Sequence, residues 1–251
     1  MKKNYLIVIP ARYNSSRLPG KPLIKILGIP MILRTYYQCL KIAPKNKILI
    51  ATDDNRILNL CKINNVNCVM TSKKCLTGTD RIAEVSKKIK AKVYINVQGD
   101  EPICNTRDLK KLIKLSQKKP NLIINGYTKI SNKNQFFSGH IPKVVFRKDG
   151  RLLYQSRAGI PTTKKHEFKL SWRQVCIYSL PYKALQIFSS QKKTNLEYIE
   201  DCELLRFLEL GLEVHMIKMS NKSISVDTKS DIKKVIKALK KKIINRANLK
   251  D

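Results

Sequence analysis

The N-terminal part of the chain contains the stretch Tyr5-Leu6-Ile7-Val8-Ile9-Pro10-Ala11-Arg12-Tyr13-Asn14-Ser15-Ser16-Arg17-Leu18-Pro19-Gly20-Lys21-Pro22. Residues 5–10 are apolar and have the length of one buried strand. The loop that follows combines two arginines, a lysine, two serines and a glycine. Polyphosphate binding requires such a loop, because it offers free backbone N–H groups and fixed positive charge. An ordinary basic surface loop is the alternative, and the position directly after the first strand favours phosphate binding.

The spacing within this loop excludes two common nucleotide-binding motifs. It matches neither the P-loop pattern G-x-x-x-x-G-K-[ST] nor the dinucleotide pattern G-x-G-x-x-G. The common ATPase and dehydrogenase interpretations therefore do not apply.

Strands and helices alternate over the next hundred residues. Apolar runs predict strands at 47–52, 66–71 and 92–97, and helical periodicity predicts helices at 30–40, 55–64, 79–90 and 108–119. This βαβα order predicts an α/β fold with a mostly parallel, doubly wound sheet. Ligands of such sheets lie beyond the carboxyl ends of the strands. The loops after Pro10, Thr71 and Val97 should therefore line one site.

The pattern changes after about residue 122. Residues 142–147 and 151–155 predict a hairpin around a glycine turn at Gly150, and 175–179 predict another strand. Residues 164–171 are polar and predict a surface loop. A helix at 197–210, a strand at 213–218 and a lysine-rich helix at 228–242 follow. We expect one domain over 1–251, with a β-rich subdomain at about 130–180.

Composition excludes several classes of protein. No apolar run is long enough to span a membrane, and the N-terminus has no secretory cleavage pattern, so we expect a cytoplasmic protein without a membrane partner. The seven cysteines lack C-x-x-C spacing, and three histidines are too few for a histidine-built metal centre. The net charge of +33 suggests nucleic acid as a partner. The lysines are spread along the whole chain with few aromatic residues between them, which favours a solvated lysine-rich surface instead.

Acidic residues follow the strand at 92–97. The sequence Gln98-Gly99-Asp100-Glu101-Pro102 puts a carboxylate at the carboxyl edge of the sheet, where Mg²⁺ is held by one or two carboxylates and substrate phosphates. A helix N-cap is the alternative, but it explains only one of the two acids. Asp227 could simply cap the last helix, and its local sequence favours that role. The turn Leu76-Thr77-Gly78-Thr79-Asp80-Arg81 could let a base lie against the backbone, although Thr77-Gly78-Thr79 alone carries little information.

Together, these segments resemble the 3-deoxy-manno-octulosonate (Kdo) cytidylyltransferases, the CMP-Kdo synthetases of lipopolysaccharide assembly. The matching stretches occur in family order over nearly the whole chain and are IPARYNSSRLPGKPL, ATDD, TGTDR, INVQGDEP, PKVVF, SRAGIP, LEYIEDCELLR and VDTKSD. The first and the INVQGDEP motifs are specific. The resemblance implies a Rossmann-like nucleotidyltransferase sheet and a cytidylyltransferase that transfers CMP from CTP to the anomeric hydroxyl of a 3-deoxy-ulosonic acid, releasing pyrophosphate.

The resemblance also implies roles for individual residues. Asp100 and Asp227 would bind Mg²⁺ and act in catalysis with Arg12 and Lys21. The CTP-binding set would be Ala11, Arg12, Ser15, Arg17, Lys21, Thr77, Gly78, Thr79 and Arg81. The sugar-binding set would be Gln98, Lys143, Arg157, Gln174, Tyr178, Glu200 and Glu203, with the Arg157 guanidinium as the natural partner of the sugar carboxylate. A homodimer is expected, with the β-rich region 130–180 as its interface.

The chain departs from the family pattern on the sugar side. Ser138-Gly139-His140 replaces an Asn-Pro-Asn run, Gln174 replaces a histidine and Leu204 replaces a glutamine. One explanation is drift with compensation. The other is a modified acid, such as 8-amino-Kdo or another ulosonic or nonulosonic acid, because a leucine offers none of the hydrogen bonds of a glutamine. The sequence does not decide which sugar acid is used. A basic nucleic-acid-binding protein remains the non-enzymatic alternative, against which the loop from Arg12 to Lys21 argues.

Overall fold

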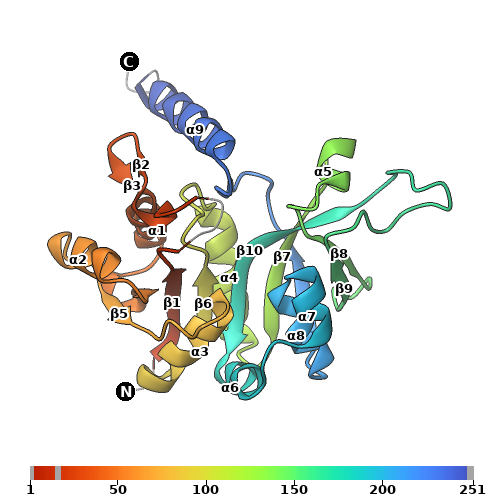
Figure 1. Cartoon of the computed structure of the whole chain (residues 1–251), viewed down its shortest axis with the longest axis horizontal. Helices are drawn as coiled ribbons and strands as arrows, with labels where there is room; N and C mark the ends of the chain where they lie inside the picture. The colour runs from red at the N-terminus through yellow and green to blue at the C-terminus, as the bar shows by residue number, and fades with distance from the viewer. Residues whose placement is uncertain (1–2, 15–17, 248–251) are drawn as a thin grey trace.

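The computed structural model describes residues 3–14 and 18–247, with side chains up to residue 241. Its centre is a twisted sheet in the order β11-β7-β10-β6-β1-β4-β5, which is mostly parallel and carries antiparallel strands on one side (Figure 1). The predicted α/β class is confirmed. The strands of this path are β1 (Lys3–Ala11), β4 (Ile48–Thr52), β5 (Cys68–Met70), β6 (Ala91–Val97), β7 (Ile123–Lys129), β10 (Trp172–Pro181) and β11 (Val214–Lys218).

The first strand forms the middle of the parallel part. β1 pairs in parallel with β4 on one side, through Ile7 and Ile48, and with β6 on the other, through Ile7 and Ile95. Its side chains alternate between two cores, with Ile7 and Ile9 in one and Leu6 and Val8 in the other. Both faces of the strand are therefore buried, which is why it reads as a continuous apolar run.

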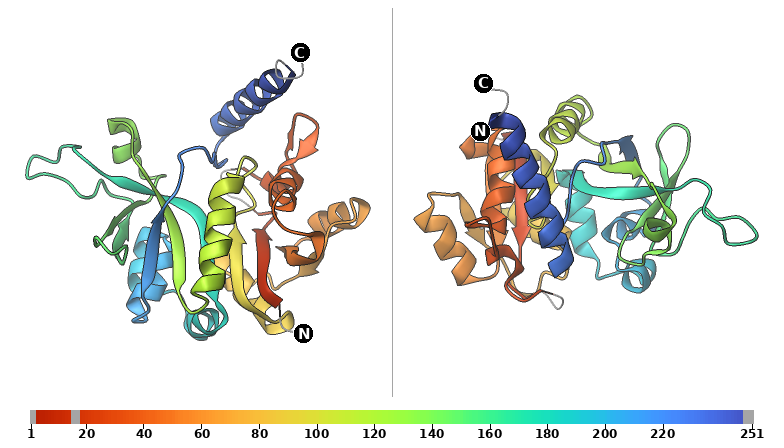
Figure 2. Two further views of the ribbon diagram at one scale, coloured as in Figure 1. Left: turned by 180° about the vertical axis from the view of Figure 1, so that it is seen from behind. Right: turned by 90° about the horizontal axis from the view of Figure 1, so that it is seen from above.

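Helices cover both faces of the sheet (Figure 2). The core on one face contains residues of α1 (Met31–Leu40), α2 (Asn55–Ile63) and α4 (Thr106–Lys118). The core on the other face contains residues of α3 (Gly78–Lys88), α6 (Tyr182–Ser190) and α8 (Glu203–Glu209). The predicted doubly wound arrangement is confirmed.

The antiparallel part of the sheet contains the predicted hairpin. Strand β8 (Lys143–Phe146) pairs with β9 (Leu152–Ser156), and Gly150 between them has a φ of 93°, which suits a glycine. The segment between β9 and β10 extends away from the rest of the molecule (Figures 1 and 2). Within the described residues, the elements that lay outside the sequence prediction are β2 (Lys25–Ile26), β3 (Ile29–Pro30), α5 (Lys133–Phe137), α6, β7 and two short 3₁₀ helices, Lys21–Leu23 and Lys45–Lys47. The division into one domain with a β-rich subdomain stays a prediction.

The predicted helix at 197–210 is wrong, because two helices occupy that range. α7 (Asn195–Glu200) ends at Asp201, whose φ is 47°, and α8 begins at Glu203. The guanidinium of Arg157 donates hydrogen bonds to the carbonyl oxygens of Glu200 (2.6 Å) and Asp201 (3.0 Å). If α7 continued, these carbonyl oxygens would accept hydrogen bonds from N–H groups of its next turn. The guanidinium of Arg157 supplies the donors in their place.

The last described helix, α9 (Lys229–Ala247), lies apart from the sheet and packs near β2 (Figure 1). Its buried residue Val235 belongs to a third core with Leu18, Ile26 and Met31. Within the described part of the chain, none of the helices has both the length and the apolar character needed to cross a membrane.

Candidate active site

A pocket of about 240 Å³ lies at the carboxyl ends of β1 and β6. The loops after Pro10, Thr71 and Val97 all contribute to it, as the strand order predicted. The residues that line the pocket are Pro10, Ala11, Arg12, Lys21, Pro22, Cys75, Leu76, Thr77, Gly78, Arg81, Gln98, Gly99, Asp100, Asp201, Glu203 and Asp227.

Two aspartates from distant parts of the chain converge on one ammonium group in this pocket. The Nζ atom of Lys21 lies 2.5 Å from Oδ2 of Asp100 and 3.5 Å from Oδ1 of Asp227. It also donates to the carbonyl oxygen of Val226 at 2.9 Å, and the Val226 N–H donates to the carbonyl oxygen of Asp100 at 3.0 Å. The backbone of the segment before α9 is thus fixed against the loop after β6. The structure brings Lys21, Asp100 and Asp227 together in one pocket, and Arg12 lines the same pocket.

The two carboxylates fit the needs of a magnesium ion. Both already contact the same cation, the ammonium group of Lys21, so their oxygens face a common point. Among the described residues, no cluster of three or more Asp, Glu, His and Cys side chains could hold a metal. Mg²⁺ commonly takes only one or two protein carboxylates and fills its remaining positions with water and phosphate oxygens. Asp100 and Asp227 therefore suffice as the protein part of such a site.

The neighbouring Glu101 has a different environment. Its side chain is fully buried, and Oε2 has no hydrogen-bond partner within the described structure. Burial, together with the negative charges of Asp100 and Asp227, raises the pKa of Glu101 to about 8. Glu101 is absent from the described lining of the pocket. Of the two adjacent acids, Asp100 is the one that faces the pocket.

Gly99 lets the loop after β6 approach β1 closely. A Cβ atom at this position would lie 2.8 Å from the carbonyl oxygen of Pro10 and 3.1 Å from the Ile32 side chain. The carbonyl oxygen of Gly99 accepts a hydrogen bond from the buried hydroxyl of Thr35 at 3.1 Å. These contacts require a residue without a side chain, and they place Asp100 at the carboxyl edge of the sheet.

The turn before α3 forms another wall of the pocket. Thr77 and Asp80 make a capping box, in which Thr77 Oγ1 accepts from the Asp80 N–H at 3.1 Å and Asp80 Oδ2 accepts from the Thr77 N–H at 2.9 Å. Gly78 lies against Pro10 and Gln98. The guanidinium of Arg81 is buried and contacts Asp53 at 2.9 Å and the Thr71 hydroxyl. Thr77, Gly78 and Arg81 line the pocket, whereas Thr79 is buried behind it.

The predicted sugar-binding residues divide into two groups. Gln98 and Glu203 line the pocket. The other five are absent from its described lining and are Lys143, Arg157, Gln174, Tyr178 and Glu200. Their binding to the sugar stays a prediction.

These five residues join the hairpin β8–β9 to α7 and β10. Lys143 is fully buried and donates to the carbonyl oxygens of Ser138 (2.8 Å) and Arg157 (2.5 Å). Burial, followed by the nearby charge of Arg157, lowers the pKa of Lys143. Glu200 accepts from the Ser156 hydroxyl at 2.6 Å and from the Arg157 N–H at 2.8 Å. The third donor group of the Arg157 guanidinium, Nη1, reaches the carbonyl oxygen of Gly139 at 2.9 Å.

Gln174 lies in a buried chain of side chains. Its Oε1 accepts from Gln155 at 2.8 Å, and its Nε2 donates to the hydroxyl of Tyr178 at 2.9 Å. Leu204, the other departure from the family pattern, is fully buried in the core around α8.

Some predicted and observed residues do not coincide. Ser15 and Arg17, predicted to bind CTP, lie outside the described residues. Asp201 lines the pocket but was not predicted, and its carboxylate lies 3.3 Å from Lys193 Nζ and 3.4 Å from Arg157 Nη2. Asp201 lies at the break between α7 and α8, and the apolar periodicity of the segment concealed that break.

Comparisons with known proteins identify the family of the chain. The sequence profile of the cytidylyltransferase family matches residues 6–224. The chain belongs to this family. Its relatives include the 3-deoxy-manno-octulosonate cytidylyltransferases of Chlamydia pneumoniae, 37% identical over 91% of each chain, and of Escherichia coli, 34% identical over 92% of this chain and 94% of the other.

Two solved structures have folds similar to that of this chain. A CMP:2-keto-3-deoxy-manno-octonic acid synthetase complexed with CTP superposes with a TM-score of 0.87 at 33% identity, covering 96% of this chain and 100% of the other. A putative glucose-1-phosphate thymidylyltransferase from Bacillus anthracis has a TM-score of 0.68 at 15% identity and covers 94% of each chain. The second likeness shows only that the fold is shared.

Proposed function

We propose that the chain transfers CMP from CTP to a 3-deoxy-ulosonic acid of the Kdo class and releases pyrophosphate. The convergence of Lys21, Asp100 and Asp227 in one pocket carries the proposal, because a triphosphate needs cationic and metal-binding groups at the same place. The family relationship supports the choice of CTP and of the sugar acid. The family resemblance also suggests lipopolysaccharide biosynthesis as the use of the product.

The reaction is a substitution at the α-phosphorus of CTP. The anomeric oxygen of the sugar acid forms a bond to this phosphorus, and the bond from the phosphorus to the oxygen that bridges to the β-phosphorus breaks. The electron pair of that bond leaves with pyrophosphate, and the proton of the anomeric hydroxyl passes to water or to the released pyrophosphate. Catalysis of such a transfer consists mainly of positioning and of stabilising charge on the phosphates.

Asp100 and Asp227 would hold Mg²⁺ beside the triphosphate. When bound there, the ion neutralises phosphate charge and polarises the phosphoryl oxygens. The ammonium group of Lys21 would contact the triphosphate as well as the two aspartates. Arg12, in the loop after β1, would also contact the triphosphate. The same loop holds Ser15 and Arg17, which we propose as further phosphate ligands.

The nucleoside would lie against Ala11 and the turn Thr77–Arg81. The small residues Ala11, Thr77 and Gly78 line the pocket there and leave room for a flat base. Thr79 would contribute through its place in this turn, because its hydroxyl is already bound to Glu203. The sugar acid would lie toward Gln98 and Glu203, with Lys143, Arg157, Gln174, Tyr178 and Glu200 shaping the region beyond them.

Release of pyrophosphate from CTP against a panel of sugar acids tests the proposal. We expect Mg²⁺-dependent release with Kdo or a close relative and no release when CTP is offered alone. Because Gln174 and Leu204 depart from the family pattern, the panel should include 8-amino-Kdo and a nonulosonic acid. Absence of release with every acid would overturn the proposed function, and salt-dependent retention of DNA or RNA would then favour a nucleic-acid-binding protein.

We also propose a homodimer in the cytoplasm, with the β-rich region 130–180 as the dimer interface. The exposed apolar side chains of Phe137, Leu153 and Leu170 in this region support it. All seven cysteines are free thiols, as in proteins of a reducing compartment. Sedimentation velocity measures the state of association, and a monomer at working concentration would contradict the dimer.

A further inference from the structure

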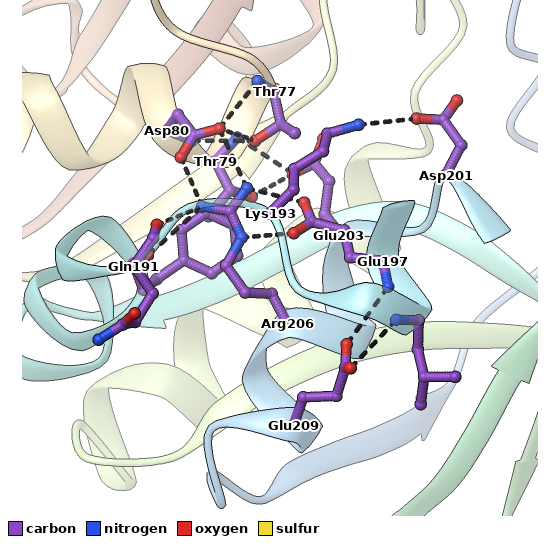
Figure 3. A network of polar contacts seen from close by, with 12 residues as sticks. Thr77, Thr79, Asp80, Gln191, Lys193, Glu197, Asp201, Glu203, Arg206 and Glu209 are labelled. Atoms are coloured by element: carbon purple, nitrogen blue, oxygen red, sulfur yellow. Dashed lines mark hydrogen bonds and ion pairs between the residues drawn. The ribbon is translucent and has the colours of Figure 1, made fainter. Parts of the chain in front are cut away.

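Arg206 of α8 is a buried arginine with several acidic and carbonyl partners. Only 1% of its surface is exposed, and it is not among the described residues that line the pocket. Its Nε and Nη2 atoms donate to the two oxygens of Glu197 at 2.5 and 2.8 Å. Its Nη1 and Nη2 atoms donate to the two oxygens of Asp80 at 2.8 and 3.3 Å (Figure 3). Its guanidinium also lies 3.7 Å from the centre of the Phe188 ring.

Asp80 connects this arginine to the pocket. Its Oδ2 atom accepts from the N–H of Thr77 at 2.9 Å and from the Thr77 hydroxyl at 2.8 Å. Thr77 in turn lines the pocket. One carboxylate therefore bonds at the same time to Arg206 of α8 and to the turn at which the nucleoside would bind (Figure 3).

A second link joins α8 to the same turn. Glu203 accepts from the Thr79 N–H at 3.0 Å and from the Thr79 hydroxyl. Thr77 and Thr79 flank Gly78, so α8 holds both sides of the one residue in the turn that has no side chain. The turn is fixed by side chains 124 and 126 residues away in the sequence.

The charges of this cluster make Arg206 its central member. The guanidinium contacts two carboxylates, Asp80 and Glu197, and a third, Glu203, lies on the same helix and lines the pocket beside the turn. Burial raises the pKa of Glu203, and the charges of Asp80 and Glu197 act in the same direction. Removal of the guanidinium would leave acidic groups close together in a medium of low dielectric constant, where their repulsion is strong.

We propose that Arg206 is a positioning residue, which acts through Asp80 to hold the Thr77–Thr79 turn in the shape that binds the nucleoside part of CTP. The proposal rests on the proposed function, because it assigns the turn to the nucleoside. A purely structural ion pair is the alternative, in which Arg206 stabilises α8 and has no separate effect on the ligand.

Two substitutions separate these roles, because each removes one carboxylate charge from the same guanidinium. Asp80→Asn keeps an oxygen that can accept from the Thr77 N–H but breaks the charged link between the turn and Arg206. Glu197→Gln breaks the other link, which leads to α7 and not to the turn. CTP with Mg²⁺ and inorganic tripolyphosphate with Mg²⁺ are titrated calorimetrically into each variant and into the unchanged protein.

We expect Asp80→Asn to weaken CTP binding by about tenfold, as the loss of a charged hydrogen-bond link would, and to leave tripolyphosphate binding within about twofold. Glu197→Gln should lower the melting temperature and leave the affinity for both probes within about twofold. Arg206→Lys retains the positive charge but cannot donate paired hydrogen bonds to a carboxylate as a guanidinium does. It should therefore weaken CTP binding selectively, by less than Asp80→Asn does. In a double-mutant cycle, the variant with both Asp80→Asn and Arg206→Lys should bind CTP no more weakly than Asp80→Asn alone, because both changes act on the same link.

Other outcomes overturn the proposal in distinguishable ways. Equal weakening of CTP by Asp80→Asn and Glu197→Gln, or equal weakening of CTP and tripolyphosphate, would show a general structural effect. If Asp80→Asn does not fold, Arg206→Lys decides, and unchanged CTP affinity in that variant refutes the positioning role. If the unchanged protein binds no CTP, the proposed function fails and this inference fails with it, whereas strong CTP binding that Asp80→Asn leaves intact refutes this inference alone.

Discussion

Asp227→Asn is expected to lower the rate of pyrophosphate release from CTP by about 10²-fold or more, because loss of a metal carboxylate removes several kcal/mol of transition-state stabilisation. The carboxylate lies 3.5 Å from Lys21 Nζ and is partly exposed in the pocket, so the change should cost little stability. An asparagine keeps the size of the side chain but removes its charge. The loss should therefore be partly reversed at higher Mg²⁺ concentration. Steady-state rates over a range of Mg²⁺ concentrations measure both effects.

Asp231→Asn is the matched control for this change, because it removes a carboxylate four residues further along the same segment. Asp231 accepts hydrogen bonds from the N–H groups of Asp227 and Thr228 at 3.2 and 3.0 Å. Its replacement should lower the melting temperature and keep the rate within about threefold, as a change of capping does. If Asp227→Asn kept the rate and lowered only stability, as in the control, Asp227 would be a capping residue and the metal assignment would be wrong.

The main strands and helices of the first half of the fold could be predicted because each of them has a local signal, which the two-residue strands β2 and β3 lack. The strand β4 is apolar from Ile48 to Ala51. The helix after it is capped by Asp54, whose carboxylate accepts from the Arg56 N–H at 2.9 Å. An apolar strand and a helix cap can both be recognised from residues that are adjacent in the sequence. The parallel order then follows from the lengths of the connections.

The second half depends on contacts between distant residues. Strand β7 contains Asn125 and Gly126, which give it no apolar run. Asn125 is nevertheless buried, because its Nδ2 donates to the carbonyl oxygens of Val175 and Ile177, where β10 shifts its register. The sequence does not show these acceptors, which lie 50 and 52 residues away. The same reason explains the break at Asp201, which depends on Arg157.

The candidate site shows the same division. Lys21 and Asp100 could be placed in the pocket because each follows a predicted strand, and the sheet brings the ends of its strands together. Asp227 required the family resemblance, since its local sequence suits a helix cap equally well. Arg206 could not be recognised, because an arginine within an apolar helix gives no sign of carboxylates on α3 and α7.

Lys21→Met is expected to lower kcat/KM for CTP by about 10²- to 10³-fold, as removal of one preorganised charge at a phosphoryl or acyl centre does. The ammonium group of Lys21 contacts Asp100 and Asp227. It therefore lies beside the place at which the triphosphate would bind. Methionine retains most of the apolar length of lysine and removes only the charged end. KM for CTP should rise and kcat should fall, because the charge acts both on the bound triphosphate and on its transition state. Initial rates at several CTP concentrations separate the two.

Lys25→Met tests whether this effect is local or belongs to the general field of a chain with a net charge of +33. Lys25 is exposed on β2, four residues from Lys21, and its removal changes the net charge by the same amount. At 0.15 M salt the Debye length is about 8 Å, so one exposed lysine among many contributes little to the field in the pocket. We therefore expect Lys25→Met to keep kcat/KM within about twofold and to remain indifferent to added salt. Equal losses in the two variants, both reduced by salt, would show that the overall charge attracts CTP and that Lys21 has no specific place beside the triphosphate.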